Sequence, residues 1–235
     1  MTSDKWGPFQ GRMLHTSYGT CSLFLTMVET VAGNPGDKSP GTQVQGGVVK
    51  FPKLDFVTGI CRPRIGPTDG QVYVAGLRGW QTTAAKDAGF QRVRYTGAPV
   101  KMPTELRVLK DGVAITFTAP LDASIAKDPA NYAVEQWNYK WSSDYGSAEY
   151  SVIEPKEKGH DGVEVEKVTL SPDRKTVTLK LEEVVPVMQM KIQMKLKAAD
   201  GTPLEYSVYN TINKVPGGGG TKTPKTPTTT AAAAQ

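Results

Sequence analysis

Alternating apolar and polar positions dominate the C-terminal half of the chain. In residues 176–182, Val177, Leu179 and Leu181 alternate with polar residues, and in residues 188–198 every second position is apolar. A period of two is the signature of a half-buried antiparallel β-strand. The pattern therefore predicts two strands here, each with one face toward a core.

Residues 59–97 predict a compact sheet unit. The runs 60–65, 71–77 and 90–95 have the pattern of strands, and the turn at residues 67–70 ends in Asp-Gly. Asp-Gly supplies the residue with positive φ that a tight hairpin needs. We expect one antiparallel three-stranded unit, which cannot bury both of its faces alone.

The motifs of residues 59–97 have an earlier counterpart. GRMLHTSYGT, CSLFLTMVETV and QGGVVKFP follow the same order as GICRPRIGPTDG, QVYVAGLRGW and FQRVRYTG, and Gly11 and Gly59 are 48 residues apart. A repeat of this length is typical of β-propeller blades. Two copies are too few, because a closed propeller takes about 4–8 blades. Residues 1–97 are therefore predicted to be the terminal blades of an incomplete propeller.

An incomplete propeller has an open sheet edge, and such edges pair with other strands. We expect the partner to be the missing propeller blades or another chain at this edge. Dimerisation or low solubility would follow.

The pattern changes at Ala98-Pro99, which predicts a domain boundary. About seven short strands in residues 98–216 favour an immunoglobulin-like (Ig-like) β-sandwich, without the Cys…Trp…Cys core of immunoglobulin domains. The chain as a whole is predicted to be all-β. Residues 33–42 are expected to form a surface loop, and residues 217–235, GGGGTKTPKTPTTTAAAAQ, a disordered low-complexity tail.

One predicted strand, residues 131–141, changes its phase. The apolar positions begin at Tyr132 and Val134 and then move to Trp137. Because a slip of one residue turns every later side chain to the other face, the sequence predicts a β-bulge near Gln136.

The formal net charge of +5 is unevenly distributed. Residues 1–97 hold 11 Lys/Arg and 6 Asp/Glu, residues 98–216 hold 15 and 17, and the tail adds two lysines. The basic residues do not cluster into a stripe along the sequence, so we expect no nucleic-acid partner. No apolar run is long enough for a membrane span, and the start MTSDKWGPFQG is not a secretory signal peptide.

Candidates for catalysis or metal binding are few. His15 has no evident partner for a base, and His160 lies in a polar turn with too few ligands nearby for a metal. The aspartate of the turn at residues 67–70 is better explained by turn formation than by calcium binding. Cys21 and Cys61 leave two alternatives open, a disulfide or two small buried strand residues. We predict no catalytic, cofactor-binding or metal-binding residue.

The strongest binding candidate is a set of aromatic residues. Trp137, Tyr139 and Trp141 share one face of their predicted strand, and Tyr145 follows. An exposed row of this kind can stack on sugar rings or dock a protein, whereas a buried row belongs to a core or an interdomain contact. Burial of both tryptophans would exclude the platform.

Together, several stretches resemble a known family. GPFQGRMLHTSYGTCSLFL, QGGVVKFP and RIGPTDGQVYVAGLRGWQTTAAKDAGFQRVRYTG resemble the last blades of bacterial quinoprotein-type sorbosone/glucose dehydrogenase propellers, in particular those of large exported proteins with haem-binding domains. WNYKWSSDYGSAEYSV, KGHDGVEV and PVMQMKIQMKL resemble the Ig-like domain that follows such a propeller. The resemblance covers roughly residues 6–215.

The resemblance implies a periplasmic or extracellular location. It also implies pyrroloquinoline quinone and calcium in a full-length parent, held mainly by earlier blades, so this chain is expected to be a C-terminal fragment or a split gene product. Three hypotheses follow: a non-catalytic segment with a structural or interdomain role, a carbohydrate- or protein-binding β-sandwich module, and a sugar oxidoreductase completed by the missing upstream blades.

Overall fold

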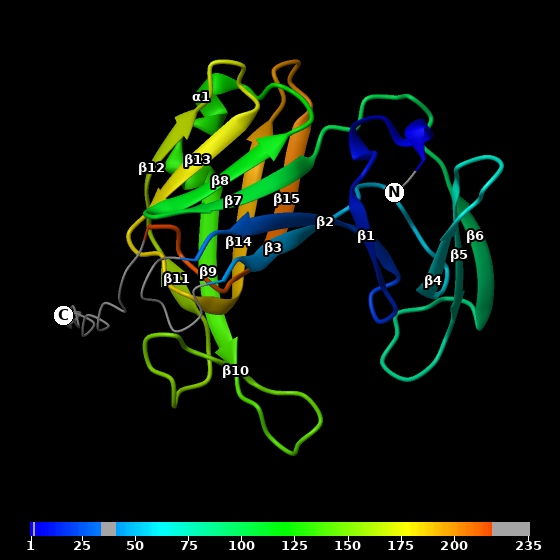
Figure 1. Cartoon of the computed structure of the whole chain (residues 1–235), viewed down its shortest axis with the longest axis horizontal. Helices are drawn as coiled ribbons and strands as arrows, with labels where there is room; N and C mark the ends of the chain where they lie inside the picture. The colour runs from blue at the N-terminus through cyan, green and yellow to red at the C-terminus, as the bar shows by residue number, and fades with distance from the viewer. Residues whose placement is uncertain (2, 34–40, 218–235) are drawn as a thin grey trace, which may run out of the picture.

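The protein is an all-β protein with several antiparallel sheets (Figure 1). The computed structural model describes residue 1, residues 3–33 and residues 41–217. Most of the predicted surface loop at 33–42, and all of the predicted tail after Gly217, lie outside the described residues.

The largest sheet combines strands from both ends of the chain. Its order is β1 (Met13–Ser17), β2 (Ser22–Val31), β3 (Gln43–Lys50), β15 (Pro203–Ile212), β14 (Val187–Lys197), β9 (Tyr132–Tyr139) and β10 (Glu149–Tyr150), with β11 (Asp161–Val163) paired to β9. The joint is the antiparallel pairing of β3 with β15, in which Val49 lies opposite Val208. This one sheet therefore contains strands from both sides of residue 98, the position at which the sequence predicted a domain boundary.

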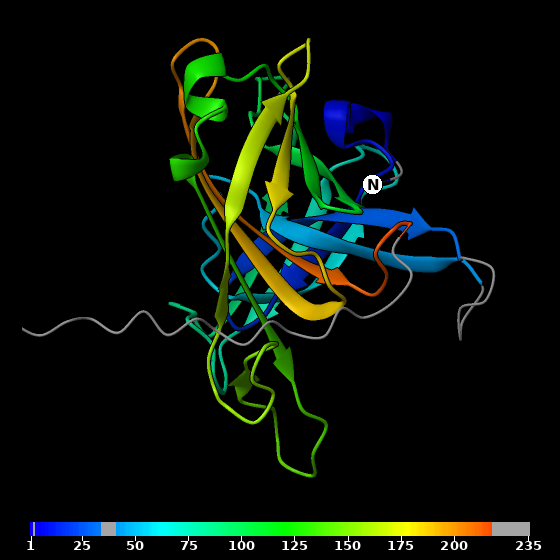
Figure 2. The same ribbon diagram turned by 90° about the vertical axis from the view of Figure 1, so that its left-hand side faces the viewer.

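A four-stranded sheet covers one face of the large sheet. Its order is β12 (Val165–Leu170), β13 (Thr176–Leu181), β8 (Gly112–Phe117) and β7 (Pro103–Leu109). In Figure 2, β12 (yellow-green) and β13 (yellow) run at a steep angle to β2 and β3 (blue). The short helices α1 (Ala123–Ala126) and η2 (Pro129–Asn131) lead into β9.

The core between these sheets follows the predicted alternation. Val177, Leu179 and Leu181 of β13 are buried, as are Met190, Ile192, Met194 and Leu196 of β14. Met188 departs from the expected face, because a register shift between Val187 and Met190 buries Val187 and leaves Met188 half-exposed.

The predicted bulge near Gln136 is wrong. The pairing of β9 with β14 runs without a shift from Tyr132 to Trp137. Gln136 takes the buried position that follows Val134, and Trp137 therefore points to the opposite face of the sheet. The apparent phase change marks an aromatic residue on the outer face.

The predicted unit of residues 59–97 is confirmed as a three-stranded antiparallel sheet, with β5 (Val72–Leu77) between β4 (Gly59–Ile65) and β6 (Ala88–Val93). Gly70 adopts a φ of 68° at the turn, and the Asp69 carboxylate accepts hydrogen bonds from the Gln71 amide (3.0 Å) and the Tyr73 hydroxyl (2.7 Å). Near this turn, the Trp6 indole of the 3₁₀ segment η1 (Asp4–Phe9) donates to the Gly70 carbonyl at 2.7 Å. The sequence repeat thus corresponds to two hairpin-linked trios of strands, β1–β3 and β4–β6.

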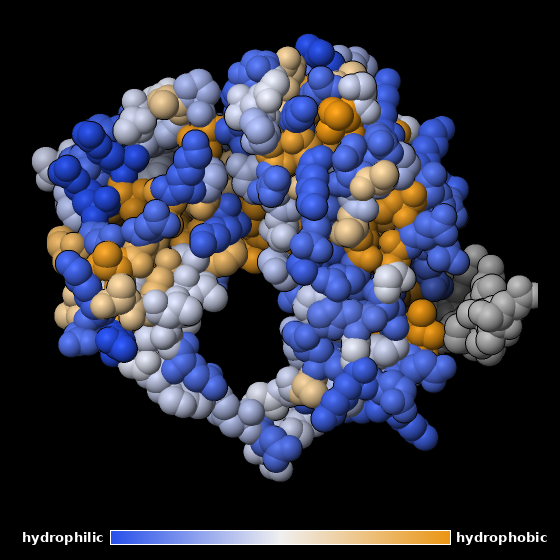
Figure 3. Space-filling view, turned by 180° about the vertical axis from the view of Figure 1, so that it is seen from behind, coloured by the Kyte–Doolittle hydropathy of each residue, from blue (hydrophilic) through white to orange (hydrophobic). Residues whose placement is uncertain are grey.

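An opening passes between the three-stranded sheet and the two packed sheets (Figure 3). The ring centroids of Trp80, which follows β5, and Tyr145, which follows β9, lie 5.3 Å apart, so these two parts of the chain are in contact. The cysteines form no disulfide: Cys21 is buried and Cys61 is exposed, and both are free.

Candidate functional site

Trp137 lies on the outer face of the large sheet, yet only 4% of it is exposed. The imidazole of His160 covers its indole, with ring centroids 3.9 Å apart and planes inclined by 8°. The indole Nε1–H donates to the Tyr139 hydroxyl at 2.9 Å. Trp137 is therefore a packed residue, unable to present its ring to a ligand.

His160 is held between two carboxylates. Nδ1 lies 3.1 Å from Glu135 Oε2, and Nε2 lies 2.6 Å from Glu149 Oε2. The second oxygen of Glu135 accepts from Lys191 Nζ at 2.7 Å, and these two residues face each other across β9 and β14. Strand pairing brings Glu135 and Lys191 together. Glu149, on β10, and His160, the residue before β11, reach the same place because both strands pair with β9.

This network shifts the pKa values of its members. Burial disfavours the charged imidazole, but the hydrogen bonds to Glu135 and Glu149 outweigh it and raise the pKa of His160. The hydrogen bond from Lys191, followed by that from His160, lowers the pKa of Glu135. The protonated form of His160 is thus stabilised where it ties the segment after β10 to β9.

Asp161, next to His160, organises the turn that follows β10. Its Oδ1 accepts from the Ser151 hydroxyl at 2.7 Å, and its Oδ2 accepts from the amides of Val152 (2.5 Å) and Ile153 (3.0 Å). The His-Asp pair therefore anchors residues 149–161 to the sheet. His160 lies in the irregular segment between β10 and β11, where the sequence predicted a polar turn. Its partners are 11 and 25 residues away, and no local motif predicts them.

The other predicted platform residues occupy different places. Tyr139, at the end of β9, is partly exposed, whereas Trp141 and Tyr145 lie on the loop between β9 and β10 and are 102% and 88% exposed. Tyr145 contacts Trp80 of the β5–β6 connection. The structure does not gather the four residues into one flat row: Trp137 is covered, and Trp141 and Tyr145 remain accessible.

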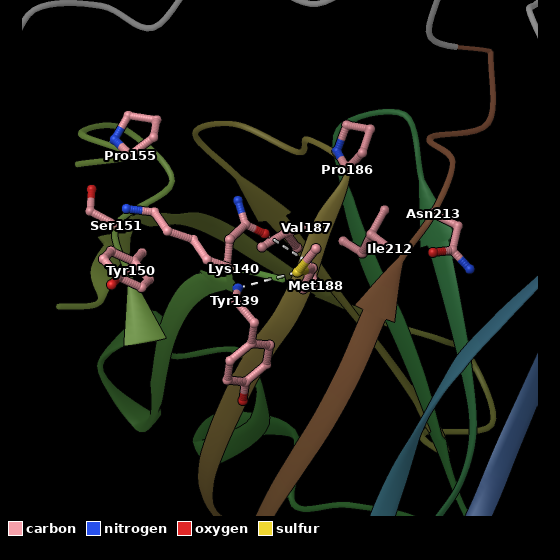
Figure 4. A pocket seen from close by; sticks show the side chains of 11 residues that line it. Tyr139, Lys140, Tyr150, Ser151, Pro155, Pro186, Val187, Met188, Ile212 and Asn213 are labelled. Atoms are coloured by element: carbon pink, nitrogen blue, oxygen red, sulfur yellow. Dashed lines mark hydrogen bonds between the residues drawn. The ribbon is translucent and has the colours of Figure 1, made fainter. Parts of the chain in front are cut away.

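Next to this loop lies a groove of about 460 Å³ at the ends of β9, β14 and β15 (Figure 4). Met188 lies near its middle, and its sulfur accepts a hydrogen bond from the Tyr139 amide at 3.2 Å. On one side the Lys140 ammonium lies 3.5 Å above the centre of the Tyr150 ring, a cation–π contact. Apolar side chains with a few polar groups at the rim are the usual lining of a ligand site.

The remaining candidates show local roles. His15 is exposed on β1 beside Phe24, and the Asp69 carboxylate is engaged by its own turn. Among the described residues, no group of three or more His, Cys, Asp or Glu side chains is arranged to hold a metal ion. The described helices include none that could cross a bilayer.

Comparison with protein-family models, curated proteins and solved structures finds no match to this chain.

The His160 network predicts a pH-dependent contribution to stability. A group whose pKa is raised on folding stabilises the fold below its unfolded pKa, and this contribution is lost as the pH rises through the folded value. We expect His160→Gln to lower the melting temperature at pH 5.5 by about 2–4 °C. This corresponds to a loss of about 1 kcal/mol in the free energy of unfolding, as partly exposed, screened ion pairs contribute. At pH 9 the difference should shrink.

Thermal unfolding followed by circular dichroism at both pH values tests this prediction. His15→Gln is the matched control, because His15 has no carboxylate partner among the residues that the structure describes. An equal loss of melting temperature for His160→Gln at pH 5.5 and pH 9 would contradict stabilisation by the ion pairs of His160 with Glu135 and Glu149.

Proposed function

We propose that this chain is a non-catalytic segment of an exported sugar-dehydrogenase-like protein, in which terminal propeller blades are fixed to a trailing Ig-like β-sandwich. The pairing of β3 with β15 carries the proposal, because it ties the first trio of strands to the C-terminal sheet by backbone hydrogen bonds. The face-to-face packing of the two larger sheets supports the sandwich.

Side chains reinforce this joint. The Glu29 carboxylate on β2 accepts from the Val108 amide of the four-stranded sheet at 3.0 and 3.1 Å. Gln45 on β3 donates to Glu29 at 2.9 Å and accepts from the amides of Asn213 (3.0 Å) and Lys214 (2.9 Å). Arg12 and Glu105 add an ion pair at 2.6 Å. A joint of this kind suits an interdomain role, since it fixes β1–β3 to β15 and to the four-stranded sheet.

Two measurements test the proposal. Sequencing the coding DNA upstream of Met1 is expected to reveal an in-frame propeller, and a stop codon followed by a genuine start site would refute the fragment. Reconstitution with pyrroloquinoline quinone and calcium is expected to give no dye reduction with any aldose. Reduction by this chain alone would favour the third hypothesis, a sugar oxidoreductase.

A second candidate function is carbohydrate binding by the β9–β10 loop. The observation that favours it is the full exposure of Trp141, the residue that follows the groove-lining Lys140. An exposed aromatic ring offers a flat apolar face to a sugar. Polar groups such as the Asn213 side chain lie on the groove wall (Figure 4).

We expect Trp141→Ala to weaken the binding of a neutral oligosaccharide about tenfold, equivalent to about 1.4 kcal/mol. A glycan array identifies the ligand, and calorimetric titration of wild type and variant then measures the change. Val28→Ala, at an exposed apolar residue of β2, is the control. No ligand on the array, or unchanged affinity in Trp141→Ala, would refute this function.

A further inference from the structure

The outer face of the three-stranded sheet carries an unusual set of side chains. Residues directly opposite each other in an antiparallel sheet point to the same face. The register places Arg64, Tyr73 and Arg92 in one row, and Arg62, Ala75 and Phe90 in the next. Val72 and Val74 alternate with Tyr73 and Ala75 and are buried on the opposite face. Arg62, Arg64, Tyr73, Ala75, Phe90 and Arg92 therefore form one surface, here called the arginine face.

The arginine face is open and positively charged. Phe90 is 72% exposed, and the three arginines are exposed as well. None of the three has an acidic side chain within 4.0 Å in the described part of the chain. The carboxylate of Asp69 lies close by, because it accepts a hydrogen bond from the Tyr73 hydroxyl. With three arginines and this one aspartate, the net charge of the face is about +2.

Tyr73 and Phe90 form a single aromatic stack. Their ring centroids are 5.6 Å apart and their planes are inclined by 16°. Because one side of the Phe90 ring is taken by Tyr73, the stack offers one free ring face at Phe90. Ala75 lies between Phe90 and Arg62 in their row, so no bulky side chain separates the ring from that guanidinium.

We propose that the arginine face binds an acidic oligosaccharide made of uronic acid residues. The apolar side of one sugar ring stacks on Phe90, and its carboxylate pairs with Arg62. The planar guanidinium fork matches a carboxylate with two parallel hydrogen bonds. Arg64 and Arg92, which flank Tyr73 in the next row, bind the carboxylate of a neighbouring residue of the sugar chain.

The charge and the stack favour an acidic sugar over single-stranded nucleic acid. Proteins that bind single strands combine a continuous basic groove with separate aromatic platforms for successive bases. This face has three arginines and one shared aromatic stack. Its charge complements a short run of carboxylates, and its single free ring face complements one sugar ring.

This site is separate from the joint between β3 and β15 and from Trp141, and it does not rest on either proposed function. The Trp141 loop and the arginine face use different residues, and they are expected to take neutral and acidic sugars respectively. Loss of one activity therefore leaves the other measurable.

Calorimetric titration of the full chain with an oligogalacturonate of defined length tests the proposal. We expect saturable binding that weakens with added salt, because exposed charges are screened. The fully methyl-esterified oligomer, which lacks the carboxylates, should bind the wild-type protein at least about tenfold more weakly. Oligogalacturonate should bind the Arg62→Gln and Phe90→Ala variants more weakly by a similar factor.

Controls separate the site from general charge. Arg107→Gln removes an exposed arginine from β7, and Trp141→Ala removes the exposed indole of the other candidate site; both should bind oligogalacturonate like wild type. The proposal is overturned by absent binding, by equal binding of the esterified oligomer, or by unchanged affinity in Arg62→Gln and Phe90→Ala. Tighter binding of oligothymidylate, lost in the same variants, would overturn it in favour of nucleic acid.

Discussion

Gly47→Val is expected to lower the free energy of unfolding by about 3 kcal/mol, and the melting temperature by about 6–12 °C. Gly47 lies in β3 opposite Asn210 of β15. A Cβ atom at this position would be 2.5 Å from the Tyr209 carbonyl oxygen and 2.8 Å from Asn210 Cβ. Both contacts are too short, so the strands must separate where the N- and C-terminal parts of the large sheet meet. Urea denaturation followed by circular dichroism measures the loss.

Gly162→Val is the matched control for this variant. Gly162 also lies in a strand, β11, but an added Cβ meets no described heavy atom within 4 Å. Its free energy of unfolding should stay within about 0.5 kcal/mol of wild type. If Gly47→Val unfolded at the same urea concentration as Gly162→Val, the β3–β15 joint and the interdomain role that depends on it would be refuted.

Local periodicity predicted the parts of the fold that depend on neighbouring residues. The alternation in β13 and β14, and the Asp-Gly turn before β5, were sufficient to place strands and a hairpin. The pairing of β3 with β15 was not predictable in this way. An alternating pattern identifies which side chains of a strand face a core, but it does not specify which other strand pairs with it. The change of pattern at residue 98 marks a connection, and the large sheet nevertheless continues through both regions.

The candidate site was predicted only in part. The sequence singled out Trp141 and Tyr145, which are accessible, together with Trp137, which is covered. It missed the cover because His160 reaches Trp137 through the register of β11 on β9, a long-range contact. The arginine face was also missed, since its arginines lie on two strands, β4 and β6, and come together only when both strands pair with β5.

Trp137→Ala is expected to lower the free energy of unfolding by about 3–5 kcal/mol, the usual cost of truncating a buried tryptophan. Removing the indole takes away the surface on which His160 stacks and the donor to the Tyr139 hydroxyl. The imidazole then loses its position between Glu135 and Glu149. The stabilising effect of His160 at pH 5.5 should therefore fall in the same variant, as a double-mutant cycle with His160→Gln would measure.

Trp141→Ala provides the contrast, because its fully exposed side chain should change the free energy of unfolding by no more than about 0.5 kcal/mol. The two tryptophans lie four residues apart and were grouped by their sequence pattern, yet their environments assign them different roles. Trp137 is packed under His160 and holds it in place, whereas Trp141 is available to a ligand. Equal stabilities of the two variants would show that Trp137 is uncovered in solution, and the four-residue aromatic platform would again be the better description.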